Sequence, residues 1–276
     1  MRNLQVTIIA IFLVISVVFC AVFAYNHLML DREAPLIVCD GQPLYVSVNA
    51  SDRDLCAGLT ASDDVDGDLT DRIIVRKVSQ LVSSSAAMVS YVVFDSSSNI
   101  CTYSRYVHYT DYRTPVFSLT QPLVYNAGST VTLADCLFAT DSLDGDISDR
   151  IRVDHSNLSN TVEGEYPMRV TVTNRMGDTS SVDLRVLIQN VTSLHPVIHL
   201  SDYLIYHPLG TELSEEALRD YILMVRQSKG GAEIDADRVD ILSEIDPTQR
   251  GSYHVYYSYT NDQNLSYTVV LTVVIE

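Results

Sequence analysis

The stretch Asp63–Val75, with the sequence DDVDGDLTDRIIV, returns 78 residues later as DSLDGDISDRIRV at Asp141–Val153. An internal repeat of this kind indicates tandem copies of one structural unit. A fainter trace of the acidic stretch, Asp237–Ile241, falls in the third copy. A proline-led apolar tetrapeptide opens each copy, at residues 34–37, 114–117 and 195–198. The sequence therefore predicts three units of about 80 residues each.

Within each unit, short runs of alternating apolar and polar residues predict β-strands. Met168–Thr173 is typical, since its apolar side chains would all face one way. Polar stretches such as Asn174–Asp178 separate neighbouring runs and predict hairpin turns. This spacing predicts an all-β fold with one antiparallel β-sandwich per unit. The short joints between units lack glycine runs, so we expect the sandwiches to follow one another end to end as a stiff rod.

One segment of the third unit departs from the strand pattern. Ser214–Val225 places Leu218, Tyr221, Ile222 and Val225 at helical spacing. Ser214 is a suitable N-cap, and the two glutamates that follow complement the helix dipole. We therefore expect a helix of about three turns near residues 214–226, where the first two units have only a short turn.

The N-terminal segment is the second informative feature. Residues 6–24 include no charged side chain, and a helix of this length spans roughly 28 Å, close to the hydrocarbon thickness of a bilayer. Arg2 precedes this run, which predicts a cytoplasmic N-terminus and extracellular C-terminal domains in a single-pass cell-membrane protein. A cleaved signal peptide ending near Ala24 is the alternative, although the apolar run is longer than a usual signal core.

These features predict four segments. They are a cytoplasmic tip with a transmembrane signal-anchor (1–30), two Ig-like domains (31–111 and 112–192) and a divergent Ig-like domain (193–276). The net charge of −17 argues against nucleic-acid binding, which rewards clustered lysine and arginine. The chain lacks the common nucleophile-elbow, zinc-protease, phosphate-loop and dinucleotide motifs, so we expect no enzymatic activity and no catalytic or cofactor-binding residues.

The acidic stretches are candidate metal sites. Calcium prefers several oxygen ligands from a tight turn, and each stretch concentrates carboxylates around a glycine: Asp63, Asp64, Asp66 and Asp68, then Asp141, Asp144 and Asp146. They do not form an EF-hand, because the twelfth position holds Ile73. The alternative is a turn in which the carboxylates accept backbone hydrogen bonds and Gly67 takes a positive φ.

Two cysteines of the first unit are candidate disulfide partners. Cys39 ends the first predicted strand, and Cys101 lies near the start of the last one. The two would meet if those strands ran side by side, and an exported compartment would allow their oxidation. Two reduced thiols remain the alternative.

The stretches APLI at residues 34–37, DLCAGLTASDDVDGDLT at 54–70 and YVVFDSSSN at 91–99 resemble the bacterial Ig-like repeats of Gram-positive surface proteins. These repeats are also appended to some pesticidal crystal proteins and are related to the hyalin repeat. The resemblance covers residues 34–111 closely, 115–189 well and 196–276 in outline. It implies Ig-like sandwiches used as a stalk, spacer or adhesive module, without catalytic activity. It also implies pairing of Cys39 with Cys101, where hyalin-type repeats carry their paired cysteines.

The sequence thus predicts a membrane-anchored extracellular repeat protein that acts as a surface stalk, adhesion or protein-interaction module. Its protein or glycan ligand is not identified by the sequence. One alternative is an accessory or sensor subunit of a cell-envelope complex. Another is carbohydrate binding, for which His254 and Tyr256 on the outward face of a strand are candidates. We expect the third domain to carry any specific binding.

Overall fold

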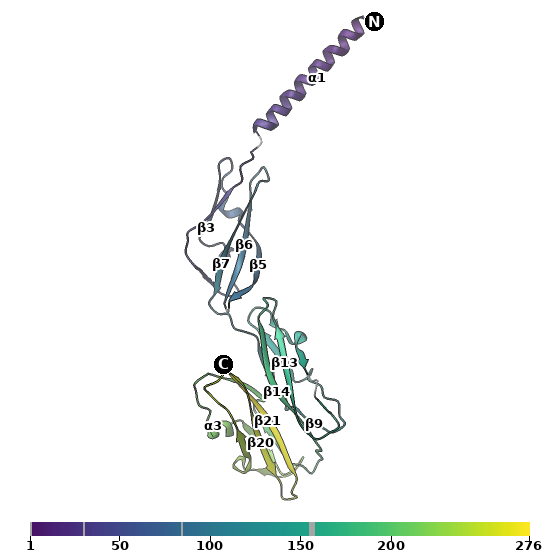
Figure 1. Cartoon of the computed structure of the whole chain (residues 1–276), viewed down its shortest axis with the longest axis vertical. Coiled ribbons are helices and arrows are strands. Elements are labelled where there is room, and N and C mark those ends of the chain that lie inside the picture. Colours follow the sequence, from purple (N-terminus) through teal and green to yellow (C-terminus); the bar gives the residue numbers. More distant parts are fainter. Residues whose placement is uncertain (1, 30, 84, 155–157) are drawn as a thin grey trace. The chain divides into compact units, whose positions relative to one another are not determined.

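The computed structural model describes residues 2–29, 31–83, 85–154 and 158–276, with the side chains of the first helix described from residue 7 to residue 25. The chain divides into two compact units, Met1–Asp111 and Tyr112–Glu276. The first compact unit contains the first predicted repeat, and the second contains the other two. Each unit is built mainly from β-strands, and the first also contains the N-terminal helix (Figure 1).

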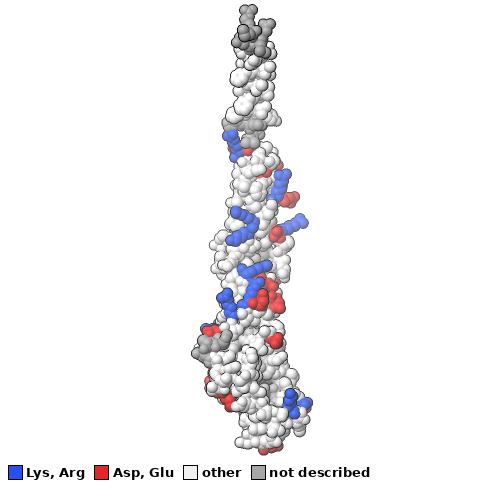
Figure 2. Space-filling view, turned by 90° about the vertical axis from the view of Figure 1, so that its right-hand side faces the viewer, with Lys and Arg blue, Asp and Glu red and all other residues white. Residues whose placement is uncertain are grey.

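Helix α1 spans Arg2–Met29. Its segment Thr7–Tyr25 is long and apolar enough to cross a membrane, and none of its side chains is buried in the structure. The described part of α1 is accordingly an uncharged surface (Figure 2). A signal sequence has the same properties, so the helix is compatible with both interpretations of the N-terminal segment.

Two sheets follow α1 in the first unit and form the first sheet pair. One sheet has three strands in the order β1-β3-β4, and the other has four in the order β2-β7-β6-β5. Strand β2 runs parallel to β7, whereas the other neighbours are antiparallel. Tyr91, Val93 and Val107 from the larger sheet are buried against Ile37 and Leu59 from the smaller one. The elements are β1 (Leu36–Cys39), β2 (Leu44–Val46), α2 (Asp52–Leu55), β3 (Leu59–Asp63), β4 (Gly67–Asp68), η1 (Thr70–Arg72), β5 (Ile74–Ser83), β6 (Ala86–Phe94) and β7 (Ile100–Tyr109).

The same arrangement of sheets occurs twice more, in the second unit. The second sheet pair has the orders β11-β10-β8 and β12-β13-β14-β9, and the third has β15-β17-β18 and β16-β21-β20-β19. The second comprises β8 (Val116–Leu119), β9 (Val124–Asn126), β10 (Leu137–Asp141), β11 (Gly145–Asp146), η2 (Ser148–Arg150), β12 (Arg152–Asp154), β13 (Gly164–Thr173) and β14 (Thr179–Gln189). The third comprises β15 (Val197–Leu200), β16 (Leu204–His207), α3 (Glu215–Arg219), β17 (Ile222–Arg226), β18 (Glu233–Ile234), η3 (Ala236–Arg238), β19 (Asp240–Ser243), β20 (Gly251–Thr260) and β21 (Ser266–Ile275).

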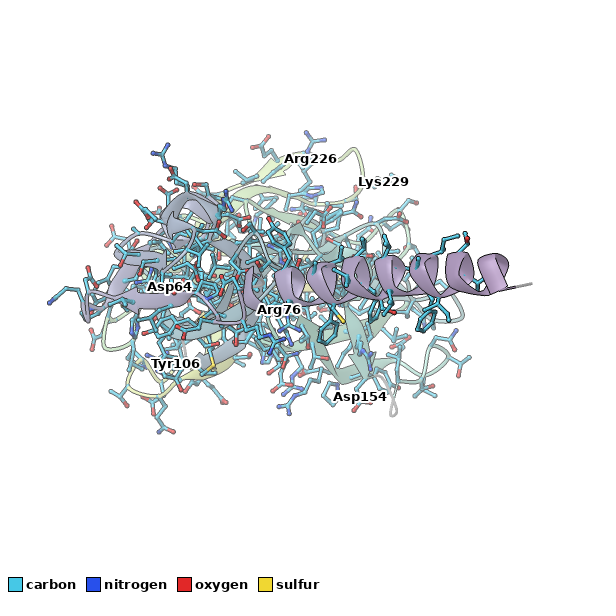
Figure 3. All side chains as sticks on the ribbon, turned by 90° about the horizontal axis from the view of Figure 1, so that it is seen from above. Asp64, Arg76, Tyr106, Asp154, Arg226 and Lys229 are labelled. Carbon is cyan, nitrogen blue, oxygen red and sulfur yellow. The ribbon has the colours of Figure 1, made fainter. Side chains whose placement is uncertain are left out.

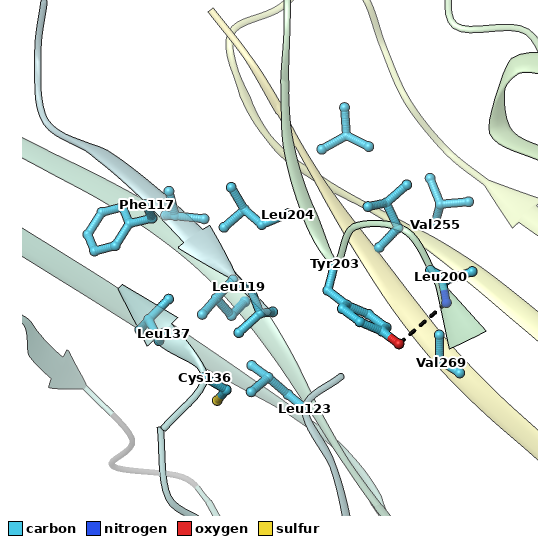
Figure 4. Close-up of a cluster of buried hydrophobic side chains, with 14 of the residues drawn as sticks. Phe117, Leu119, Leu123, Cys136, Leu137, Leu200, Tyr203, Leu204, Val255 and Val269 are labelled. Carbon is cyan, nitrogen blue, oxygen red and sulfur yellow. Dashed lines mark hydrogen bonds between the residues drawn. The ribbon is translucent and has the colours of Figure 1, made fainter. Parts of the chain in front are cut away.

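The second and third sheet pairs share one hydrophobic core. Buried residues of β8 and β10 belong to the same cluster as buried residues of β15, β16, β20 and β21, and Figure 4 shows Leu119 and Leu204 within it. Strand β14 lies against β20 and β21 (Figure 1). The expected end-to-end arrangement is therefore wrong for these two sheet pairs, which pack side by side instead.

Polar side chains of the third sheet pair complete this packing. The Tyr206 hydroxyl accepts a hydrogen bond from the backbone N–H of Phe117 on β8, at 2.7 Å. On β14, the backbone N–H of Asp183 donates to Ser252 Oγ at 3.1 Å, and the Asp183 carbonyl lies 2.9 Å from His254 Nε2. Strands β8 and β14 would otherwise leave these backbone groups unpaired, and an unpaired buried backbone group is costly.

The helix expected near residues 214–226 is shorter than predicted. Ser214 caps α3 as expected, because its hydroxyl accepts from the backbone N–H of Ala217. The helix ends at Arg219, however, and Ile222–Arg226 form β17, which pairs with β15. This strand pairing prevails over the helical spacing of the apolar residues. A short helix is also present in the first sheet pair (α2), so it does not distinguish the third.

Candidate metal centre

The predicted acidic loop of the first sheet pair is a tight turn between β3 and β4. Asp63 begins it, and its Oδ1 accepts hydrogen bonds from the backbone N–H groups of Val65 and Asp66, at 3.0 and 2.9 Å. Gly67 takes the positive φ of +75° that was expected of it. The second sheet pair repeats this geometry, with Asp141 Oδ1 accepting from the two equivalent N–H groups.

The remaining predicted ligands of the first loop do not converge with Asp63. Asp66 Oδ2 accepts the backbone N–H of Ser96, and hydrogen bonds from Ser96 lower the pKa of Asp66. Asp68 Oδ1 accepts from the backbone N–H of Thr70, and bonds from Thr70 lower the pKa of Asp68 in the same way. Asp64, labelled in Figure 3, is exposed. Asp68 therefore caps its own turn, and Asp66 links the loop to the turn between β6 and β7.

In the second loop, arginine and serine residues form ion pairs and hydrogen bonds with the carboxylates. Asp144 forms ion pairs with Arg150 at 2.5 Å and with Arg175 at 2.9 Å. Burial raises the pKa of Asp144, but the Arg175 N–H and the Arg150 side chain outweigh it, so the net direction is downward. Asp146 accepts from the Ser148 hydroxyl and backbone N–H, which lower its pKa. These partners already neutralise or satisfy the carboxylates that were predicted to bind calcium.

A different set of carboxylates converges in the first sheet pair. Asp63 meets Asp31, from the segment between α1 and β1, and Asp95, from the turn between β6 and β7. One oxygen of each lies within 4.8 Å of the others. Asp95 is only 7% exposed. Like charges at this distance repel by about 3.5 kcal/mol or more per pair at an effective dielectric constant of about 20.

Asp31 and Asp95 were missed because they lie far from the acidic loop in the sequence. A trace of the site is nevertheless present in the repeat. The hairpin turn after the central strand begins with Asp95 in the first copy but with Asn174 and Asn261 in the others. Each of these residues accepts turn N–H bonds through its side-chain oxygen, so the three positions are equivalent.

The predicted Cys39–Cys101 bridge is not formed, and all five cysteines are free thiols in the structure. The first and last strands do not run side by side, because β1 belongs to the three-stranded sheet and β7 to the four-stranded one. Cys39 Sγ instead lies 3.6 Å from Arg105 Nη1. Cys101 lies on β7, in the facing sheet, and packs against the same hydrophobic core as Cys39.

The predicted sugar-binding candidates face the second sheet pair. Besides the contact of His254 with the Asp183 carbonyl, the Tyr256 hydroxyl donates to Glu165 Oε1 at 2.7 Å. Burial is the largest influence on His254 and lowers its pKa. Both side chains therefore hold the second unit together, and this correction removes the sequence-based argument for carbohydrate binding.

No family model matches the chain. Over 208 residues the chain is 26% identical to the pesticidal crystal protein Cry22Aa of Bacillus thuringiensis, a match that covers 74% of the chain but only 27% of the crystal protein.

Among solved structures, Drosophila N-cadherin EC1-3 is similar over 89% of the chain and 90% of its own length, with 13% identity and a TM-score of 0.30. The M60 catalytic domain with CBM51 domains of Clostridium perfringens ZmpB is similar over 87% of the chain and 30% of its own, with 12% identity and a TM-score of 0.25. Scores this low identify no shared function. The chain is a mostly β protein with one apolar N-terminal helix and weak similarity to a pesticidal crystal protein.

Proposed function

We propose that the chain is a membrane-anchored extracellular protein of three Ig-like domains that acts as a protein-interaction module. Helix α1 is the anchor in this proposal, because its segment Thr7–Tyr25 is long and apolar enough to cross a membrane and none of it is buried within the described structure. The partner is a β-sandwich of the same kind, and a second copy of the chain is the simplest candidate.

The observation that carries the proposal is an uncovered sheet face in the first sheet pair. The outer face of β2-β7-β6 carries four exposed large side chains, which we call the open face: Tyr45, Phe94, Ile100 and Tyr106, with exposures of 64, 41, 53 and 54%. They share one side of the sheet, since Phe94 pairs with Ile100 and Tyr106 lies two residues before the partner of Tyr45.

The equivalent face of the third sheet pair is covered. Thr272 on β21 occupies the position of Tyr106 in the repeat and is only 2% exposed, and Val270 beside it is 8% exposed. Strand β14 of the second sheet pair lies against this sheet. A face of this type therefore accepts the edge of a neighbouring sandwich, and exposed apolar patches of this kind mark interaction sites.

Self-association of the full chain in detergent tests the partner. Light scattering coupled to size exclusion should show concentration-dependent dimers, and Tyr106→Glu should abolish them because it places a charge in the open face. Leu223→Glu is the control, since Leu223 is 67% exposed on β17 and belongs to the second unit. A wild-type chain that stays monomeric, or equal loss in both variants, would contradict the proposal.

The anchor has a separate test. The protein recovered from membranes should keep its full mass of 30.7 kDa and resist extraction at alkaline pH. A mass lacking the first 24 or so residues would instead identify a signal peptide.

A further inference from the structure

We propose that Asp31, Asp63 and Asp95 bind one calcium ion, which ties the segment leaving α1 to two turns of the first sheet pair. Binding at this site requires neither the membrane anchor nor the open face. Of the predicted calcium ligands, Asp63 alone belongs to it.

The hydrogen bonding of Asp31 and Asp63 leaves one oxygen of each carboxylate without a donor. Asp31 Oδ1 accepts the backbone N–H of Glu33 at 2.9 Å, and Asp63 Oδ1 accepts the two N–H groups of its own turn. Asp31 Oδ2 and Asp63 Oδ2 are shielded from solvent, and no hydrogen-bond donor of the described residues reaches them. A buried carboxylate oxygen without a partner is costly, and a cation would remove that cost.

In the other two sheet pairs, an asparagine takes the place of Asp95, and its amide donates hydrogen bonds at the position proposed for the cation. In the second, Asn174 Nδ2 donates to Asp141 Oδ2 at 3.0 Å, and Asp141 is the counterpart of Asp63. In the third, Asn261 Nδ2 donates to the backbone carbonyls of Leu194 and Gln227, at 2.8 and 2.9 Å. The first sheet pair has a carboxylate, Asp95, where the others have this amide. It therefore supplies a third acceptor in place of the donor.

A neighbouring amide supports the acidic arrangement. Asn99 Nδ2 donates to Asp95 Oδ2 at 2.7 Å and to the Asp31 carbonyl at 3.1 Å, and its backbone N–H donates to Asp95 Oδ1. The counterpart of Asn99 in the second sheet pair is Asp178, which accepts from Tyr112. The amide and the carboxylate have thus exchanged places between the two turns. Asn99 orients Asp95 without reaching the free oxygens of Asp31 and Asp63.

The spacing of the oxygens suits calcium. Three points within 4.8 Å of one another have a common centre no more than about 2.8 Å from each. Calcium takes six to eight oxygens at about 2.3–2.6 Å, so a small inward movement completes the contacts and water supplies the rest. Magnesium demands about 2.0–2.1 Å and a stricter octahedron, which this triangle fits less well. We expect a dissociation constant on the order of 0.1–1 mM, as in extracellular calcium modules.

Calcium titration of the full chain in detergent, prepared in EDTA, tests the site. Calorimetry should show one bound calcium per chain. Calcium at tenfold above the dissociation constant should raise the melting temperature of the first unit by about 5–10 °C. Magnesium at the same concentration should give a smaller shift.

Two variants and a control make the test specific. Asp95→Asn copies the residue found in the other turns, so it should fold, and it should be at least as stable as wild type in EDTA while losing the calcium shift. Asp31→Asn should lose the shift as well. The control, Asp64→Asn, removes a charge from the same loop but from an exposed side chain and should respond like wild type. The proposal is overturned if wild type shows no calcium shift, if Asp95→Asn keeps it, or if Asp64→Asn loses it equally.

Discussion

The shared core of the second unit predicts that a single hydroxyl links the stability of two sheet pairs. The Phe117 backbone N–H donates to the Tyr206 hydroxyl at 2.7 Å. Tyr206→Phe removes this acceptor without changing the packing of the ring. Leaving a buried N–H unsatisfied costs about 1–3 kcal/mol, and part of this is recovered if water reaches the group. We therefore expect the free energy of unfolding to fall by about 1–2 kcal/mol.

Differential scanning calorimetry of the full chain measures this loss. For a unit of about 160 residues, this change should lower the melting temperature of the second unit by about 3–6 °C. The second unit should also melt in one transition, because its core runs through both sheet pairs.

The control is Tyr253→Phe, which removes a hydroxyl whose exposed 3.2 Å bond to the Gln249 carbonyl stays within the third sheet pair. It should change the melting temperature by less than about 2 °C, since exposed hydrogen bonds contribute little net stability. The reasoning is refuted if Tyr206→Phe behaves like this control. It is also refuted if the second unit melts in two steps of which only one moves.

Three further predictions concern the same structure. Deleting residues 193–276 should unfold the second sheet pair as well, because the deletion exposes its half of the common core. Circular dichroism of the truncated chain should show a loss of strand content beyond the deleted residues, and a cooperative melt of the second sheet pair would contradict this. Burial raises the pKa of Tyr206 and Tyr267 to about 12, so the folded state keeps protons that the unfolded state releases near pH 10. The free energy of unfolding of the second unit should therefore keep its full value below pH 10 and fall as the pH rises toward 12. Denaturant titrations at pH 9 and 11 would measure this fall. Gly67→Ala should lower the unfolding free energy of the first unit by about 1 kcal/mol through strain at φ +75°, since no atom lies within 4 Å of the added methyl; an unchanged melting temperature would count against this.

Local patterns in the sequence predict the elements of this fold well. The hairpin turns at Asn174–Asp178 and Asn261–Asn264 lie where the alternating runs end, and Gly67 takes its positive φ. Strand alternation, turn chemistry and N-caps depend on neighbours within a few residues, so the sequence carries them directly.

The site is predicted less completely. The repeated acidic stretch draws attention to Asp63, but Asp64, Asp66 and Asp68 have other environments in the same turn. The partners of Asp63 come from two other connections, and their convergence depends on which strands become neighbours.

By itself, the sequence determined the repeat, the β-strand content, the turns and the apolar N-terminal helix. Only the tertiary structure decided that β1 and β7 belong to different sheets and that Cys39 and Cys101 are free thiols. It also decided that the second and third sheet pairs merge their cores, and that Asp31 and Asp95 join Asp63. The physical reason is that strand order, edge coverage and the meeting of distant turns are set by packing between segments far apart in the chain, where no local periodicity records which surfaces will touch.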